Sequence, residues 1–153
     1  MKPTEQEVAQ IRQRAAERGR QKHLSYAGAV TPSEAHLLME GGVATLIDVR
    51  TDAEQHYVGA VPGADGVEWN RFPDGQRNPA FLAELEKSVP KDRPVMFLCR
   101  SGVRSHGAAE AATRAGWKEA YNILEGFEGD KDADGHRGKL GGWRKAGLPW
   151  VQS

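Results

Sequence analysis

Short apolar runs alternate along this chain with segments that have the composition of helices. The runs are VATLIDVR (43–50), RPVMFL (93–98) and EAYNIL (119–124). Runs of this kind are typical of strands that are buried on both faces of a parallel sheet. Because strand and helix signals alternate at short spacing, the sequence predicts an α/β domain with helices flanking a mostly parallel central sheet.

The helix between residues 32 and 40 has the clearest start and stop signals. Thr31 is a capping residue, Glu34 completes a capping box, and Gly41 follows the last turn. The remaining expected elements are helices over residues 4–22, 79–89 and 105–115, a helical turn at residues 143–146, and a short strand within residues 66–69.

The first 24 residues are predicted to form a helical extension ahead of a domain that covers residues 25–153. Its apolar stripe is thin and consists of Val8, Ile11 and Ala15. A stripe this narrow favours a surface helix or a partly frayed arm. A dimer contact is the alternative, so the oligomeric state stays open.

Composition limits the function classes. A length of 153 residues suits one domain, and the formal net charge of zero argues against a nucleic-acid or anionic-membrane partner. No apolar run approaches the roughly 20 residues of a membrane span, and the N-terminus lacks a signal-peptide core. A cytoplasmic location is therefore expected, and a single cysteine suits a reducing compartment.

The only cysteine, Cys99, stands between a predicted buried strand and a predicted helix start. Main-chain N–H groups at a helix start attract anions, and Arg100 and Arg104 add positive charge. A thiol in this place is expected to lose its proton readily and become a nucleophile. Ser101 adds a hydroxyl donor, and Gly102 gives the loop backbone freedom. The alternative is a buried cysteine that only fills space.

Five segments, in this order, resemble a single-domain rhodanese, which is a rhodanese-like sulfurtransferase. They are LIDVR (46–50), VGAVPGA (58–64), VMFLCRSGVRS (95–105), AGW with YNILEG (115–126) and GGWRKAGLPW (141–150). The resemblance spans residues 30 to 150 and implies a rhodanese-like three-layer fold.

The resemblance also implies a mechanism. Cys99 would attack the outer sulfur of thiosulfate or of a persulfide donor, become a persulfide, and pass the sulfur to a thiophilic acceptor, for which cyanide serves in vitro. Neither a metal nor an organic cofactor is implied, since the intermediate is the cysteine persulfide itself. The partners would be a small anionic sulfur donor and, as an open alternative, a sulfur-acceptor protein. The substrate-binding loop would comprise Arg100, Ser101, Gly102, Val103, Arg104 and Ser105.

Two other functions are compatible with the same loop. One is a regulatory module that carries a persulfide or senses redox state through Cys99 without turnover. The other is a thiol phosphatase or arsenate reductase, but the phosphatase branch of this fold resembles Cys-x5-Arg. The present loop, Cys99 to Arg104, is the shorter Cys-x4-Arg form that resembles sulfurtransferases.

Three further features of the sequence lead to structural predictions. The resemblance implies that Asp48 and Arg50 form a structural ion pair, as strand-end charges usually need partners when buried. Residues 130–135, DKDADG, imitate the start of a calcium loop but lack the required later glutamate, which favours an acidic turn. The segment near residues 127–140 is an insertion, longer than the corresponding segment of typical single-domain rhodaneses. We expect it to form a flap or hairpin over the site mouth.

Overall fold

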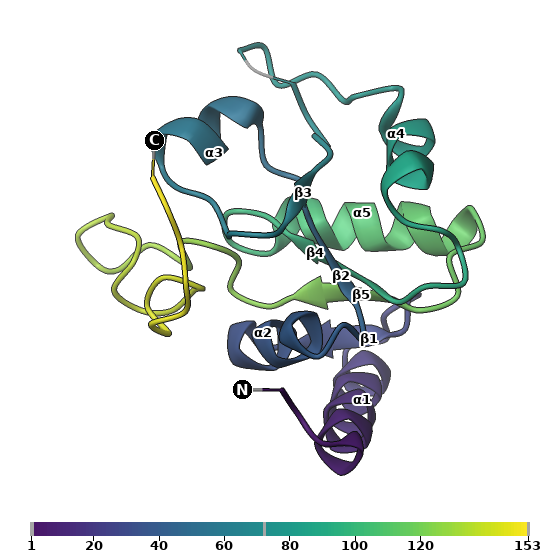
Figure 1. Cartoon of the computed structure of the whole chain (residues 1–153). Coiled ribbons are helices and arrows are strands. Elements are labelled where there is room, and N and C mark those ends of the chain that lie inside the picture. Colours follow the sequence, from purple (N-terminus) through teal and green to yellow (C-terminus); the bar gives the residue numbers. More distant parts are fainter. Residues whose placement is uncertain (1, 72, 153) are drawn as a thin grey trace.

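The computed structural model describes residues 2–71 and 73–152, and a five-stranded sheet of order β1-β5-β4-β2-β3 forms its centre (Figure 1). All four pairings between neighbouring strands are parallel. The predicted α/β class with a mostly parallel sheet is therefore confirmed. The strands are Gly28–Val30 (β1), Thr45–Asp48 (β2), Asp65–Gly66 (β3), Val95–Leu98 (β4) and Ala120–Ile123 (β5).

Five helices accompany the sheet. They are Glu5–Gln21 (α1), Pro32–Glu40 (α2), Asp52–Tyr57 (α3), Phe81–Ser88 (α4) and Val103–Arg114 (α5). Figure 1 shows α1 and α2 on one side of the sheet and α4 and α5 on the other. No helix in the described residues is long and apolar enough to cross a membrane.

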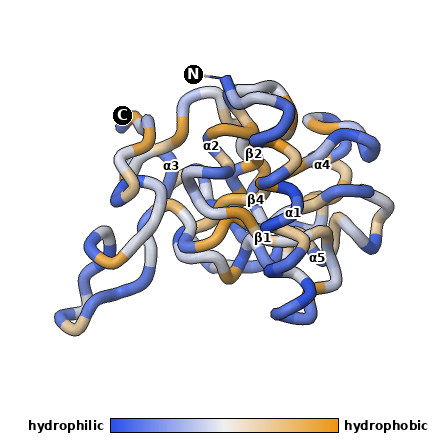
Figure 2. The backbone as a smooth tube through the Cα atoms, turned by 90° about the horizontal axis from the view of Figure 1, so that it is seen from below, coloured by the Kyte–Doolittle hydropathy of each residue, from blue (hydrophilic) through white to orange (hydrophobic). Residues whose placement is uncertain are grey.

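Both faces of the sheet are buried, and alternate strand residues point to different cores. Ile47 and Phe97 belong to the core under α4 and α5. Leu46 and Met96 belong to the core under α1 and α2. This two-sided burial explains why the strands read as continuous apolar runs rather than as alternating ones. Figure 2 shows the same distribution, with apolar colours on the central strands and hydrophilic colours on the outer loops.

Helix α1 is a surface helix with a tightly packed inner face. Ile11 and Ala15 are fully buried against the core that α2 also covers. A Cβ atom added to Gly28 in β1 would lie 2.2 Å from the carbonyl oxygen of Ala15, so helix and strand are in direct contact. The expectation of a partly frayed arm is wrong, whereas the domain boundary at residue 24 stays a prediction.

Replacing Ile11 by alanine is expected to lower the free energy of unfolding by about 2–5 kcal/mol, the usual cost of a cavity in a core. Urea denaturation measures this change. The exposed neighbour Gln10, replaced by alanine, is the control on the same helix and should change stability little. Equal small losses in both variants would contradict a stabilising role for the inner face of α1.

Several elements differ from the sequence expectation. The sequence does not predict β1 or α3, which have only three and six residues. Helix α4 begins at Phe81 rather than residue 79, and the short strand, Asp65–Gly66, starts one residue before the expected range 66–69 and overlaps it at Gly66. Residues 143–146 form the expected single helical turn, in which the N–H of Ala146 donates to the carbonyl of Gly142 at 3.0 Å. Glycines on both sides keep it from continuing as a helix.

Candidate active site

Cys99 is the first residue after β4, the middle strand of the sheet. In a parallel sheet the carboxyl ends of strands form the usual place for a site. The chain turns through residues 99–102 and enters α5 at Val103, with Gly102 at the cap in a left-handed conformation (φ 110°). This turn brings the N–H of Gly102 to 3.0 Å from the Sγ of Cys99, to which it donates a hydrogen bond.

The thiol is buried, yet it does more than fill space. Cys99 is 1% exposed and packs in the core under α5, as the space-filling alternative expected. Its sulfur nevertheless contacts polar groups on two sides, the N–H of Gly102 and the hydroxyl of Ser105 at 3.2 Å. Both residues belong to the predicted binding loop, so the structure brings three of the predicted residues together.

A second segment fixes the outer side of this loop. The N–H of Phe127 donates to the carbonyl of Cys99 at 2.7 Å, and the N–H of Glu128 donates to the carbonyl of Arg100 at 3.0 Å. These bonds fix the backbone of the loop, in which the N–H of Gly102 points at the Cys99 sulfur.

Arg104 is held by a carboxylate that the sequence did not single out. Its guanidinium donates to both oxygens of Glu54 on α3, at 2.6 and 2.9 Å. These bonds raise the pKa of Arg104 above its ordinary value. Burial alone would raise the pKa of Glu54, but the bonds from Arg104 outweigh it and leave that pKa below its ordinary value. Arg104 therefore stays charged and fixed beside the loop.

The Glu54→Gln variant is expected to be less stable than the wild type at neutral pH, and its stability is expected to change less as the pH is lowered. A carboxyl whose pKa is lowered by folding stabilises the folded protein above its ordinary pKa, and this stabilisation is lost as the pH falls through the folded value. Thermal unfolding measured from pH 7 downward should therefore decline more steeply in the wild type. Glu86→Gln, at an exposed position on α4, should keep the wild-type profile.

Two hollows flank the loop. One, of about 420 Å³, is lined by Arg71, Arg100 and Arg104 together with Asn70 and other residues. The other, of about 370 Å³, lies between the segment at Tyr26, the loop and the end of β5. Glu54 lines the first hollow and pairs with Arg104, so the side chains left to attract an anionic ligand are Arg71 and Arg100. Of the other predicted loop residues, Ser101 lines the second hollow and Val103 is exposed at the start of α5.

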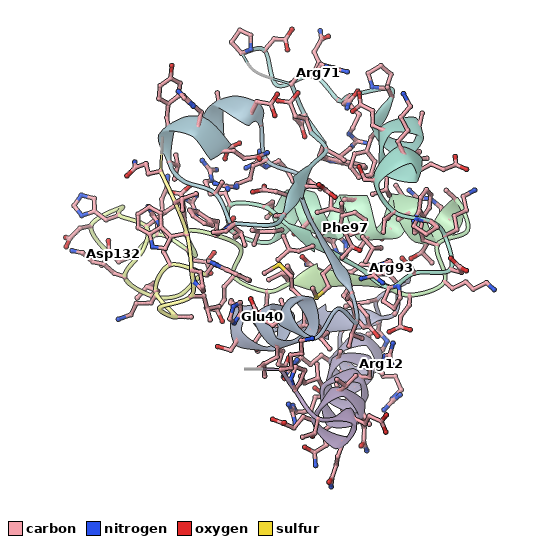
Figure 3. The ribbon with its side chains drawn as sticks, viewed as in Figure 1. Arg12, Glu40, Arg71, Arg93, Phe97 and Asp132 are labelled. Carbon is pink, nitrogen blue, oxygen red and sulfur yellow. The ribbon has the colours of Figure 1, made fainter. Side chains whose placement is uncertain are left out.

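The segment expected to form a flap does not cover either hollow. Its first residues contact the cysteine loop, but residues 130–140 line neither of the two hollows, so the predicted flap over the site mouth is wrong. The segment is closed by its own backbone bonds, from Asp132 to His136 and from Gly138 to Glu128. Tight turns at its glycines keep it folded on itself. Figure 3 shows Asp132 at the outer edge and Phe97 within the central sheet.

The calcium-like motif is a turn. One oxygen of Asp132 accepts hydrogen bonds from the N–H groups of Asp134 and His136, both at 2.9 Å. Within residues 2–71 and 73–152, no group of three metal-ligating side chains occurs. The carboxylate of Asp132 is thus occupied in shaping the turn.

Asp48 and Arg50 form an ion pair beneath the site. Three bonds join the side chains, from Nε of Arg50 to the two carboxylate oxygens at 3.0 and 3.3 Å and from Nη2 at 2.7 Å, and both residues are buried. Arg50 also donates to the carbonyl of Gly59 at 2.8 Å and lies 4.2 Å from the centre of the Phe127 ring. The pair thereby connects the end of β2 to two neighbouring loops.

Asn122 is a second polar residue that the sequence did not single out. It lies in β5 next to β4, and its Oδ1 accepts a hydrogen bond of 2.5 Å from the hydroxyl of Ser105. Its Nδ2 donates to the carbonyl of Gly102 at 3.2 Å. The available signal was an asparagine within the otherwise apolar run AYNIL, since a buried amide needs partners.

These observations define an α/β domain with a buried thiol in the short loop between the central strand and helix α5. Residues 31–133 match the family model of the rhodanese-like domain, and the chain belongs to this family. The crystal structure of Rv0390 from M. tuberculosis is similar, with 51% identity, a TM-score of 0.76, and coverage of 84% of this chain and all of that one.

Two curated relatives complete the comparison. An uncharacterized protein of Rickettsia rickettsii is 37% identical over 117 residues, which cover 74% of this chain and 88% of the relative. A protein of Allochromatium vinosum named sulfurtransferase is 30% identical over 107 residues, which cover 69% of this chain and 77% of the relative.

Proposed function

We propose that this protein is a sulfurtransferase that moves a sulfane sulfur from thiosulfate or a persulfide donor to a thiophilic acceptor through Cys99. The observation that carries the proposal is the short loop. Four residues separate Cys99 from Arg104, and the N–H of Gly102 already donates to the sulfur at 3.0 Å. Membership in the rhodanese-like family and the relative named sulfurtransferase support the same chemistry.

The reaction has two half-steps, each a displacement at sulfur. The Cys99 thiolate attacks the outer sulfur of thiosulfate, a new S–S bond forms, and the old S–S bond breaks, so that sulfite leaves with the bonding electrons. The acceptor then attacks the outer sulfur of the persulfide, and Cys99 leaves as the thiolate. Covalent catalysis of this kind gives ping-pong kinetics. No metal or organic cofactor takes part in the proposed cycle.

The loop and its surroundings have separate tasks in this cycle. The backbone N–H groups between Arg100 and Ser105 bind the charge of the persulfide and of the departing anion. The hollow with Arg71 and Arg100 attracts a small anionic donor. The proposal includes a reducing, cytoplasmic location, in which the single thiol stays available. A sulfur-acceptor protein as the physiological partner is part of the same proposal.

The test combines activity with intact mass. The protein is mixed with thiosulfate, its mass is measured before and after cyanide, and thiocyanate is followed. We expect a gain of one sulfur atom that cyanide removes, and we expect Cys99→Ser to show neither the gain nor thiocyanate. His136→Ala, in the loop away from the site, serves as the active control. The same measurement is repeated with polysulfide as a second donor.

Each other outcome points elsewhere. A persulfide that forms but is not passed to cyanide would replace the enzyme by a persulfide carrier or sensor. Hydrolysis of p-nitrophenyl phosphate without any persulfide would favour the phosphatase alternative. If neither donor gives a persulfide, the sulfurtransferase proposal fails.

A further inference from the structure

The hydrogen of the Ser105 hydroxyl has only one possible direction in this structure. The carbonyl oxygen of Gly102 can only accept, so the Asn122 atom that faces it at 3.2 Å is the amide nitrogen. The amide oxygen of Asn122 therefore faces Ser105 at 2.5 Å, and it can only accept as well. The hydroxyl hydrogen of Ser105 must point at Asn122.

The state of the sulfur follows from this assignment. The Ser105 oxygen lies 3.2 Å from the Cys99 sulfur, and its only hydrogen is already given to Asn122. With that hydrogen on Asn122, the contact between sulfur and hydroxyl is a hydrogen bond only in the S–H form of Cys99, in which the sulfur donates. The chain of bonds runs from Cys99 to Ser105 to Asn122, and all three side chains are buried.

This arrangement cannot persist when the sulfur becomes an anion. Once the thiol proton has left to solvent, the lone pairs of sulfur and of the Ser105 oxygen would face each other. The hydroxyl then turns and donates to the thiolate, and the amide oxygen of Asn122 loses the hydrogen bond from Ser105. The same hydroxyl can return to Asn122 when the sulfur loses its charge as the inner atom of a persulfide.

We propose that Asn122 is a positioning residue that competes with the Cys99 sulfur for the hydrogen of Ser105. While the sulfur is uncharged, the Ser105 hydroxyl donates its hydrogen bond to Asn122. When Cys99 becomes a thiolate or departs as one, the hydroxyl donates that hydrogen bond to the sulfur instead. The role of this competition in catalysis rests on the proposed sulfurtransferase function. The competition itself is inferred only from the three hydrogen bonds among Cys99, Ser105, Asn122 and Gly102.

The other charges around the sulfur stay in place when Asn122 is changed. They are Arg100 and Arg104 in the loop and α5, Glu54 on α3, Asp48 and Arg50 at the end of β2, Glu125 and Glu128 after β5 with Arg144 beside Glu128, and His106 with its partners Tyr26 and Glu110. Tyr26 also hydrogen-bonds Asn122. That contact is lost whether or not Ser105 is present, so a change that depends on Ser105 reports the competition itself.

The test follows the absorbance of the thiolate at 240 nm as the pH is raised. The Cys99→Ser protein supplies the baseline, and a chain with one cysteine gives a signal from one site. In Asn122→Ala the hydroxyl is free to donate to the sulfur. The midpoint of the absorbance step should therefore move to lower pH by about one unit, which corresponds to roughly tenfold more thiolate below the midpoint.

The matched control is the same substitution in a chain that lacks the hydroxyl. In Ser105→Ala, adding Asn122→Ala should leave the midpoint unchanged. Asn122→Val, which suits a strand, is the second variant if the alanine protein unfolds, and circular dichroism checks each fold. No shift in the first comparison, or an equal shift in both backgrounds, overturns the proposal.

The titration does not require sulfur transfer, so it separates the two proposals. If Asn122→Ala shifts the absorbance midpoint only in proteins that retain Ser105, the competition is supported even if the protein makes no thiocyanate. An active enzyme without the shift retains the proposed function and loses the role of Asn122.

Discussion

An Arg50→Met protein is expected to lose about 3–5 kcal/mol of its free energy of unfolding, because a buried carboxylate is left without its counter-charge. Asp48 is 1% exposed and accepts three bonds from the Arg50 side chain, at 3.0, 3.3 and 2.7 Å, and one from the Arg50 backbone N–H at 3.1 Å, which the variant keeps. Methionine has a similar length but supplies neither charge nor donor. Urea denaturation, with the same probe for both proteins, measures the loss.

The control removes both charges at once. In Asp48→Leu with Arg50→Met, no buried carboxylate remains, and hydrophobic replacement of a buried ion pair is often neutral. We expect the double variant to be clearly more stable than Arg50→Met. It still lacks the bond from Arg50 to the carbonyl of Gly59, so some loss should remain. A double variant as unstable as the single one would show that the packing of Arg50, not its charge, stabilises the fold.

Gly126→Ala is expected to reduce sulfur transfer by about a hundredfold, the cost of a misplacement near 1 Å at a reacting group. Gly126 has a left-handed conformation (φ 65°), and an added Cβ would lie 2.5 Å from the carbonyl carbon and oxygen of Arg100. It would also lie 2.6 Å from the carbonyl oxygen of Cys99. The cysteine loop must move to relieve this clash, and kcat/KM for thiosulfate measures the effect.

Gly42→Ala separates steric clash from backbone strain. Gly42 has nearly the same conformation, with φ 68°, but nothing lies within 4 Å of the added Cβ. We expect a loss of about 1 kcal/mol in stability and no loss of sulfur transfer. If Gly42→Ala lost activity to the same degree as Gly126→Ala, the close approach of Gly126 to the loop would not explain the effect.

The sequence predicts those parts of the fold that have local signals. Helix α2 is bounded by a capping box and glycines, and β2, β4 and β5 lie in short, mostly apolar runs. The location of Cys99 after a buried strand was visible for the same reason. The packing of α1 was not, because the contact between Ala15 and Gly28 uses small residues that add little to an apolar stripe.

The site was predicted less completely, for a physical reason. Glu54 and Asn122 reach the cysteine loop only through the tertiary fold, since Glu54 lies fifty positions from Arg104 and Asn122 lies seventeen from Ser105. From the residues next to them in the sequence, Glu54 is recognisable only as a helix-capping residue and Asn122 only as a strand residue. The lengthened segment at 127–140 was expected over the site, but its glycine turns and internal bonds fold it onto itself.

The order of the strands has a consequence for synthesis on the ribosome. β1 is an edge strand that pairs with β5, although it is the first strand of the chain and β5 is the last. Strands β2 and β4 can meet as soon as β4 emerges, whereas β1, on which α1 packs, has no strand to pair with until β5 has been made. Such non-local pairing is slow and leaves early segments exposed. The strand made last therefore completes the binding surface for the helix made first.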